Sequence, residues 1–141
     1  MPPYTVYGVP WYGNDNNCGA VLGVDDHGVI NTSVQNYTYS RGSALHGLAF
    51  DPSGRYLYSA DLKGQKVWTH AIDQTTGKLT FVANETSSGE PRHINVHPNG
   101  KYAYVMLEDK NEVLLYQLDS ATGAAKYAGK AFSIIASGKL S

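Results

Sequence analysis

The stretch HGLAFDPSGRYLYSADLKGQKVWTHAIDQTTGKL, residues 46–79, decides the fold because the chain repeats its pattern further on. The second copy, RHINVHPNGKYAYVMLEDKNEVLLYQLDSATGAA, covers residues 92–125 and aligns without a gap. The matches include the turns Asp51-Pro52 and His97-Pro98, and the tyrosines Tyr56 and Tyr58 with Tyr102 and Tyr104. A period of about 40–50 residues with four strands per unit is typical of a β-propeller blade.

Each copy predicts the same succession of strands. A short apolar strand, at residues 48–50 or 94–96, leads into the turn DPSG or HPNG, where proline presets φ and glycine permits the corner. A second strand alternates aromatic and aliphatic residues, a polar turn and a third strand follow, and the turn DQTTG or DSATG precedes the fourth strand.

The segment before the repeat continues this pattern. YTVYGV, AVLGV and VINTSVQNYTY are consistent with the second, third and fourth strands of an earlier unit. We therefore predict an all-β chain of four-stranded antiparallel blades, with about three blades in one partial propeller domain over residues 1–141. The blade units are expected at roughly 4–40, 46–86 and 92–132, and the tail FSIIASGKLS, residues 132–141, has no strand pattern.

Composition limits the classes of partner. The chain has 141 residues, of which 42% are hydrophobic and 16% charged, and its formal net charge is −1. This balance predicts no nucleic-acid or membrane partner. The start of the chain has no signal-peptide pattern, and the lone Cys18 cannot form an internal disulfide, so we expect a cytoplasmic protein.

The number of blades raises the question of closure. Propellers generally close with four to eight blades, and three alone would leave two exposed sheet edges and an uncovered inner face. The sequence therefore predicts a piece of a longer propeller or a truncated gene product. The alternative is a chain that self-associates to complete a ring, which makes a homo-oligomer possible.

Three residues are candidates for a site at the mouth of the propeller channel. In the repeat His46 falls on Arg92, and both precede the innermost strand of neighbouring blades, so both should line one rim. Glu108 follows the second strand of the later blade. Arginine binds carboxylates, and histidine transfers protons near neutral pH. A structural or solvated role for the same residues is the alternative that the pattern leaves open.

The other histidines have structural interpretations. His97 should hydrogen-bond within its turn, His70 should belong to a packed or half-exposed strand face, and His27 should lie in a surface turn. His93 should point to the opposite side of the strand from Arg92. No histidine spacing matches a metal site, so neither a metal nor another cofactor is expected.

The segments LHGLAFDPSGRYLYSADLKGQKVWTH, PRHINVHPNGKYAYVMLEDKNEV and SVQNYTY resemble the fungal carboxy-cis,cis-muconate cyclases, also called 3-carboxymuconate lactonizing enzymes, among the seven-bladed lactonase-type propellers. The resemblance implies a metal-free isomerase of protocatechuate breakdown in the β-ketoadipate pathway. Its small polycarboxylate substrate, 3-carboxy-cis,cis-muconate, would be closed to a carboxymuconolactone. It also places a catalytic histidine on His46, a catalytic and substrate-binding arginine on Arg92, and an acidic site residue on Glu108.

Two departures from this family are visible. The family pattern has His-Pro before the arginine, whereas this chain has Glu90-Pro91, and an acid near the clamp would repel a polyanion. A further arginine is expected from a later blade, so the chain by itself is expected to be inactive. The alternative functions are a lactone hydrolase like the 6-phosphogluconolactonases and a non-catalytic propeller that binds a protein.

Overall fold

The computed structural model describes residues 4–11 and 17–135, and these form eleven β-strands. The strands are β1 (Tyr4–Gly8), β2 (Cys18–Val24), β3 (Ile30–Thr38), β4 (Leu45–Phe50), β5 (Tyr56–Asp61), β6 (Lys66–Ile72), β7 (Leu79–Thr86), β8 (Pro91–Val96), β9 (Tyr102–Leu107), β10 (Glu112–Leu118) and β11 (Ala125–Ser133). The described part contains no helix long and apolar enough to cross a membrane.

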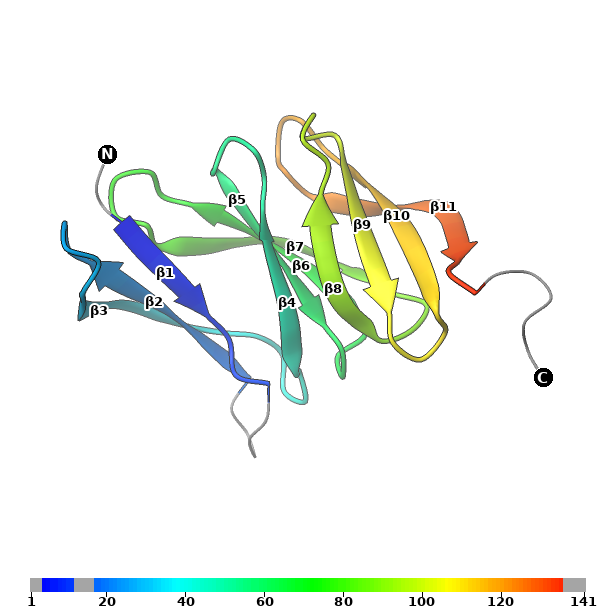
Figure 1. Cartoon of the computed structure of the whole chain (residues 1–141), viewed down its shortest axis with the longest axis horizontal. Coiled ribbons are helices and arrows are strands. Elements are labelled where there is room, and N and C mark those ends of the chain that lie inside the picture. Colours follow the sequence, from blue (N-terminus) through cyan, green and yellow to red (C-terminus); the bar gives the residue numbers. More distant parts are fainter. Residues whose placement is uncertain (1–3, 12–16, 136–141) are drawn as a thin grey trace.

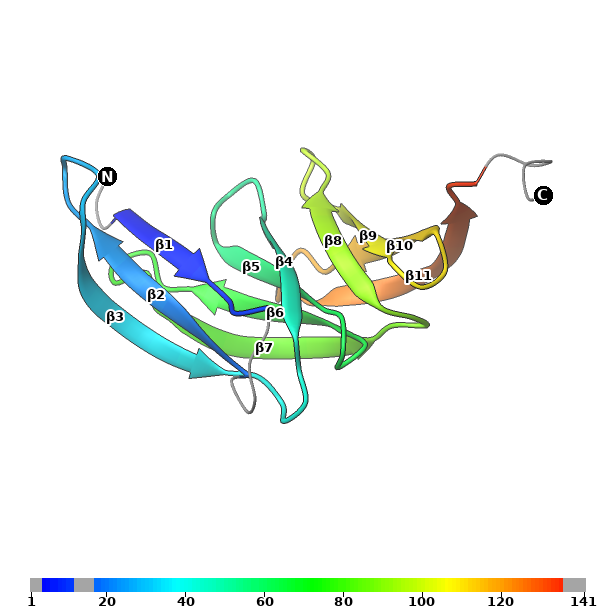
Figure 2. The ribbon, with the colours of Figure 1, turned by 60° about the horizontal axis from the view of Figure 1, so that its bottom comes forward.

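The strands form three antiparallel sheets, which we call the first (β1–β3), second (β4–β7) and third (β8–β11) sheets. In each sheet the strands pair in chain order, so every connection is a hairpin. Figures 1 and 2 show the sheets side by side in chain order, with β1 and β11 near opposite ends. The predicted all-β, bladed architecture is confirmed, with four strands in two of the sheets and three in the first.

Repeated turn chemistry explains why the second and third sheets are alike. Gly77 and Gly123 have φ of 73° and 75°, a left-handed conformation that glycine adopts without strain. In each turn the aspartate four residues earlier, Asp73 or Asp119, accepts the backbone N–H of a threonine at 2.7 Å. These hydrogen bonds hold the pKa of both aspartates below the usual value.

The hydrophobic core lies between the sheets and not within one of them. Val21, Tyr37 and Tyr39 of the first sheet meet Leu57 and Trp68 of the second. A second cluster joins the second and third sheets and includes Tyr58, Val67, Val105, Leu114 and Tyr116. Since each sheet buries a face against the adjacent sheet, the sheets must stack to be stable.

The strand boundaries differ from the prediction at two places. The innermost strands β4 and β8 begin at Leu45 and Pro91, three residues before the predicted starts, so they include His46 and Arg92. The C-terminal segment FSIIASGKLS was not expected to form a strand, yet β11 extends into it as far as Ser133. Residues 136–141 of that segment lie outside the described part.

Candidate functional site

A β-bulge at each innermost strand sets the position of the two leading candidates. In the pairing of β4 with β5, Leu45 is opposite Asp61 and Gly47 is opposite Ala60, so His46 is the extra residue. In the pairing of β8 with β9, Pro91 is opposite Leu107 and His93 is opposite Met106, which leaves Arg92 as the extra residue. Bulges redirect side chains and are frequent beside active sites.

Gly47 allows the two bulged strands to approach each other. A Cβ atom on Gly47 would lie 2.7 Å from the carbonyl oxygen of Arg92 and 3.2 Å from the Cα of His93. Both are backbone atoms, which cannot rotate away as a side chain would. The missing side chain therefore brings β4 and β8 close enough for His46 to meet Arg92.

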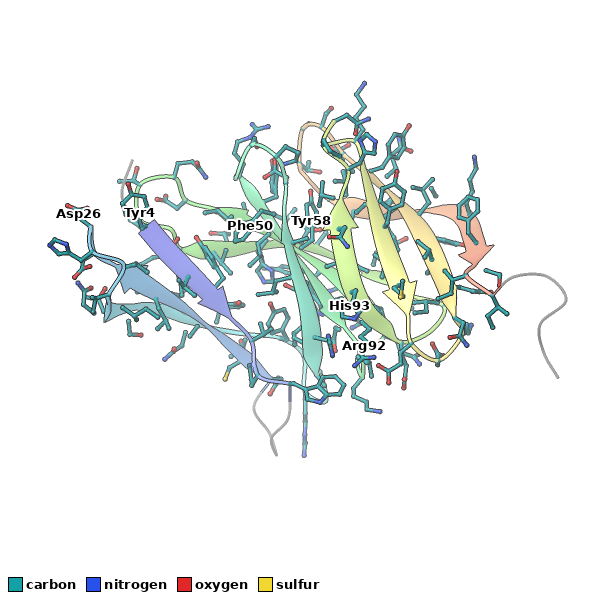
Figure 3. All side chains as sticks on the ribbon, viewed as in Figure 1. Tyr4, Asp26, Phe50, Tyr58, Arg92 and His93 are labelled. Carbon is teal, nitrogen blue, oxygen red and sulfur yellow. The ribbon has the colours of Figure 1, made fainter. Side chains whose placement is uncertain are left out.

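The three predicted residues meet at one point. The Nε–H of Arg92 donates to Nε2 of His46 at 3.1 Å, and the same nitrogen lies 3.0 Å from Oε2 of Glu108. Figure 3 labels Arg92 beside His93 at one edge of the molecule. Because Nε makes both contacts, the two terminal nitrogens of the guanidinium take no part in them. A site at this rim thus has a cation between a histidine and a carboxylate.

His46 is held neutral by its surroundings. Partial burial lowers the pKa of His46 below 6.5, and the positive charge of Arg92 and the neighbouring His93 lower it further, against the opposing effect of Glu108. Since Nε2 accepts a hydrogen bond, the proton of the neutral ring is assigned to Nδ1. Nδ1 is buried, and a hydrogen bond between the ring and the backbone of Arg92 also opposes the lowering of the pKa.

Two rings border His46 that the sequence did not place there. Trp11, from the loop after β1, meets its ring edge-on with centroids 4.9 Å apart, and His93 does so at 5.1 Å. The expectation that His93 points away is wrong because the bulge at Arg92 breaks the alternation of side chains. The sequence could have predicted this position of Trp11. Trp11 follows the predicted second strand of the first unit, just as Glu108 follows the second strand of the third unit.

Glu90, the acid that raised doubt about an anion site, is engaged elsewhere. Its carboxylate lies 3.6 Å from Nζ of Lys63, which belongs to the turn after β5. Its backbone N–H donates to the Asp109 carboxylate at 2.8 Å, and its carbonyl accepts from Glu108 at 2.9 Å. The Lys63 charge therefore offsets the negative charge that Glu90 brings near Arg92.

The other histidines lie where the sequence predicts. His97 accepts the Asn99 backbone N–H at 3.1 Å within its turn, and His27 lies in an exposed turn. His70 is 3% exposed among aromatic rings, and burial lowers its pKa to about 4. Within the described ranges no group of three or more His, Cys, Asp or Glu residues is placed to hold a metal ion.

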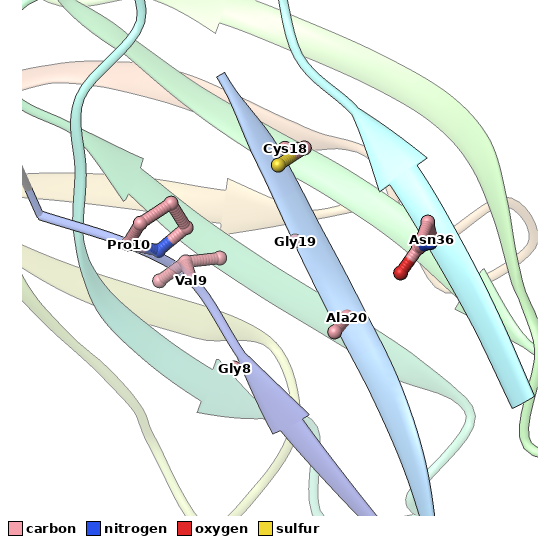
Figure 4. Close-up of a pocket in the computed structure, with 7 residues that line it drawn as sticks. All are labelled: Gly8, Val9, Pro10, Cys18, Gly19, Ala20 and Asn36. Atoms are coloured by element: carbon pink, nitrogen blue, oxygen red, sulfur yellow. The ribbon is translucent and has the colours of Figure 1, made fainter. Parts of the chain in front are cut away.

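A hollow of about 320 Å³ lies away from this rim, on the face of the first sheet that no other sheet covers. Its lining includes Gly8, Cys18, Ala20 and Asn36 (Figure 4). Apart from the Asn36 amide and the Cys18 thiol these residues bring no polar side chain. The rim, with its cation and proton-transfer groups, is the better candidate for chemistry.

Comparison with known proteins agrees with this fold. The family model described as "Lactonase, 7-bladed beta-propeller" matches residues 14–137. A carboxy-cis,cis-muconate cyclase of Neurospora crassa is 36% identical over 98% of this chain, and the chain spans 38% of that protein. A 6-phosphogluconolactonase of Yersinia enterocolitica is 32% identical over 74% of this chain and 32% of its own length.

A solved structure gives the same picture. The crystal structure of a putative 6-phosphogluconolactonase from Bacteroides fragilis superimposes with a TM-score of 0.76 and 25% sequence identity. The superposition covers 83% of this chain and 33% of the other. The chain thus spans about a third of the length of each of these proteins.

Proposed function

This chain belongs to the lactonase family of seven-bladed β-propellers, and from that premise we propose that its rim site serves the cyclisation of 3-carboxy-cis,cis-muconate. The observation that carries the proposal is the contact of Arg92 Nε with both His46 and Glu108, at a rim shared by neighbouring sheets. The 36% identity to the Neurospora crassa cyclase over nearly the whole chain supports the same assignment.

The reaction needs a cation and a proton carrier. One substrate carboxylate adds to the conjugated diene and forms a C–O bond, while the electrons of the double bond move toward the carbon beside another carboxylate. That carbon then takes a proton. Arg92 would bind a carboxylate and stabilise the developing negative charge, and its terminal nitrogens offer the bidentate fork for this. Glu108 would hold the guanidinium in place through Nε.

His46 would deliver the proton, which requires its imidazolium form. In the free site the pKa of His46 is lowered, so the ring is mainly neutral at pH 7. A bound tricarboxylate brings negative charge and raises the pKa of the ring, so substrate binding would draw a proton onto it. The adjacent ring of Trp11 would form one wall beside the substrate.

A hydrolase of the 6-phosphogluconolactonase kind is the second candidate. The similarity to the Yersinia and Bacteroides proteins favours it, and Arg92 would bind a phosphate as readily as a carboxylate. In that reaction neutral His46 would act as a base toward water. The two candidates thus require opposite protonation states of the same ring.

This difference gives the test. A chimera in which this chain replaces the aligned segment of the Neurospora crassa cyclase would be incubated with 3-carboxy-cis,cis-muconate, and the loss of diene absorbance followed against pH. For the cyclase, kcat/KM should fall as pH rises through the pKa of His46, and His46→Ala should abolish turnover in a folded chimera. Hydrolysis of 6-phosphogluconolactone without cyclisation, with a rate that rises with pH, would support the second candidate instead.

A further inference from the structure

Each sheet of this chain docks on the next through the same tyrosine. Tyr7 Oη donates to the carbonyl of Gly77 at 2.7 Å, and Tyr58 Oη donates to the carbonyl of Gly123 at 2.8 Å. Tyr7 and Tyr58 have equivalent positions in their sheets, since Tyr7 pairs with Val21 of β2 and Tyr58 pairs with Thr69 of β6. The equivalent residue of the third sheet is Tyr104, which pairs with Leu115 and is 40% exposed.

The first sheet has a turn equivalent to those that accept the tyrosine hydrogen bond in the second and third sheets. The turn that corresponds to Gly77 in the first sheet closes at Gly28, which has a φ of 81° and no atom within 4 Å of its Cβ position. Within residues 4–11 and 17–135, therefore, Tyr104 Oη has no turn carbonyl to donate to, and the turn at Gly28 receives no tyrosine. The outer face of the third sheet thus carries the donor of this contact, and the outer face of the first sheet carries its acceptor.

A second contact shows the same asymmetry. The residue after each fourth strand donates its N–H to the loop before the third strand, as Tyr39 does to Asn17 at 2.7 Å and Ile134 to Asn111 at 3.0 Å. Tyr39 packs on Trp68 of the second sheet, with ring centroids 5.3 Å apart. Ile134 has the equivalent position on the third sheet, where it is 51% exposed.

The surface that would receive Ile134 is hollow. Trp68 pairs with Asn84, and the residue with the same pairing in the first sheet is Ala20, opposite Asn36. Where the second sheet carries an indole, the first sheet therefore carries a methyl group. The hollow of about 320 Å³ in Figure 4 lies at this place, between Gly8, Ala20 and Asn36.

We propose that a second copy of this chain docks head to tail, with its third sheet on the first sheet of its neighbour. Ile134 of one copy fills the hollow at Ala20 of the other, and Tyr104 Oη donates to the Gly28 carbonyl. The large side chain and the hollow that fits it are both present in one chain, and a large residue facing a small one is how packed layers interlock. The formal net charge of −1 opposes such self-association only weakly.

The symmetry of the contact follows from its two different faces. An interface between unlike faces is heterologous and gives either a closed ring or an open row of copies. Two copies bring six sheets together, a number within the range of four to eight blades at which propellers close. The expected species is therefore a dimer, or larger oligomers that add copies at the same contact.

The mass of the 141-residue chain should be measured by sedimentation equilibrium over a wide concentration range. We expect association, and we expect both Ile134→Lys and Ala20→Trp to raise the dissociation constant by roughly tenfold or more. Ala131→Lys is the matched control, since Ala131 is exposed on β11, three residues before Ile134, and its side chain points to the other face. Far-ultraviolet circular dichroism verifies that each variant is folded.

Mixing the two variants gives the sharpest result. Ile134→Lys keeps an intact hollow, and Ala20→Trp keeps an intact Ile134. At a concentration at which each variant alone is monomeric, an equimolar mixture should therefore form a one-to-one dimer. A symmetric interface between like faces would not be rescued in this way. A wild-type chain that stays monomeric at every concentration leaves these faces to a different occupant and overturns the proposal, as does a mixture that stays monomeric.

Discussion

The turns after β5 and after β9 have the same backbone but use their carboxylates differently. They carry an acid and a leucine in opposite order, Asp61-Leu62 in one and Leu107-Glu108 in the other. In both, the second residue of the pair donates its N–H to an equivalent carbonyl at 2.9 Å. A shift of the acid by one residue thus decides whether its carboxylate lies in the core or at the rim.

The buried carboxylate is a structural group. Asp61 is fully buried and accepts hydrogen bonds from the N–H groups of Ala44 and Gly64, both at 2.9 Å, and from Trp68 Nε1 at 3.0 Å. Glu108 has 43% of its side chain exposed and contacts Arg92. The same residue class therefore holds the fold together at one turn and belongs to the candidate site at the other.

The largest expected effect comes from removing the buried carboxylate. Asp61→Ala leaves three donors without their acceptor, and hydrogen bonds to a charged group contribute about 1.5–3 kcal/mol each. We expect the free energy of unfolding to fall by roughly 3 kcal/mol or more, as measured by urea denaturation. Glu108→Ala is the control and should cost about 1 kcal/mol or less, as for other exposed ion pairs. Equal losses in the two variants would refute the distinction between the turns.

The next largest effect is expected at Gly47 of β4, the strand that follows Ala44. Gly47→Ala places a methyl group 2.7 Å from a backbone oxygen of Arg92, so β4 and β8 must separate. We expect a loss of about 1–3 kcal/mol, as for other overpacked positions. The control is Gly8→Ala, because the Cβ position of Gly8 has no atom within 4 Å. A Gly47→Ala variant as stable as Gly8→Ala would show that the approach of the strands tolerates a side chain.

These contacts also show how far the sequence alone could reach. The repeat fixed the positions of the strands, and its offset placed His46 and Arg92 in the same slot of neighbouring blades, where the structure brings them together. The bulges were missed because they are single-residue breaks in alternation that no residue type requires. As a result, the strand starts at β4 and β8 and the direction of His93 were wrong.

Contacts between sheets were the second kind of omission. The pairing of Glu90 with Lys63 joins two turns that are far apart in the sequence, and no local pattern specifies it. Trp11 approaches His46 from the first sheet, where the repeat is weakest. What a repeat predicts well is the content of one blade, while its contacts with the next depend on how the blades pack.

A smaller effect tests the exposed carboxylate at the rim. The negative charge of Glu108 raises the pKa of His46, in opposition to burial and Arg92, so Glu108→Gln should lower that pKa further. Nuclear magnetic resonance titration of the ring protons measures the change. His70, which is buried among aromatic rings and has a pKa of about 4, should titrate alike in both proteins. An unchanged pKa of His46 would mean that its interaction with Glu108 is screened by solvent.

The smallest expected effect is a difference in stability that arises from backbone strain in the same two turns. Gln65 and Asn111 have φ of 49° and 53° at equivalent positions, a conformation that costs most residues about 1–2 kcal/mol. Asparagine tolerates it better than glutamine because its short side chain bonds locally. Gln65→Gly should therefore stabilise the fold by up to about 1 kcal/mol after the entropy cost of glycine, and Asn111→Gly by less. Since the carbonyls of Gln65 and Asn111 accept from Ser87 and Ile134 in the same way, the comparison isolates the strain. Equal gains in urea denaturation would show that the side chain at this position does not matter.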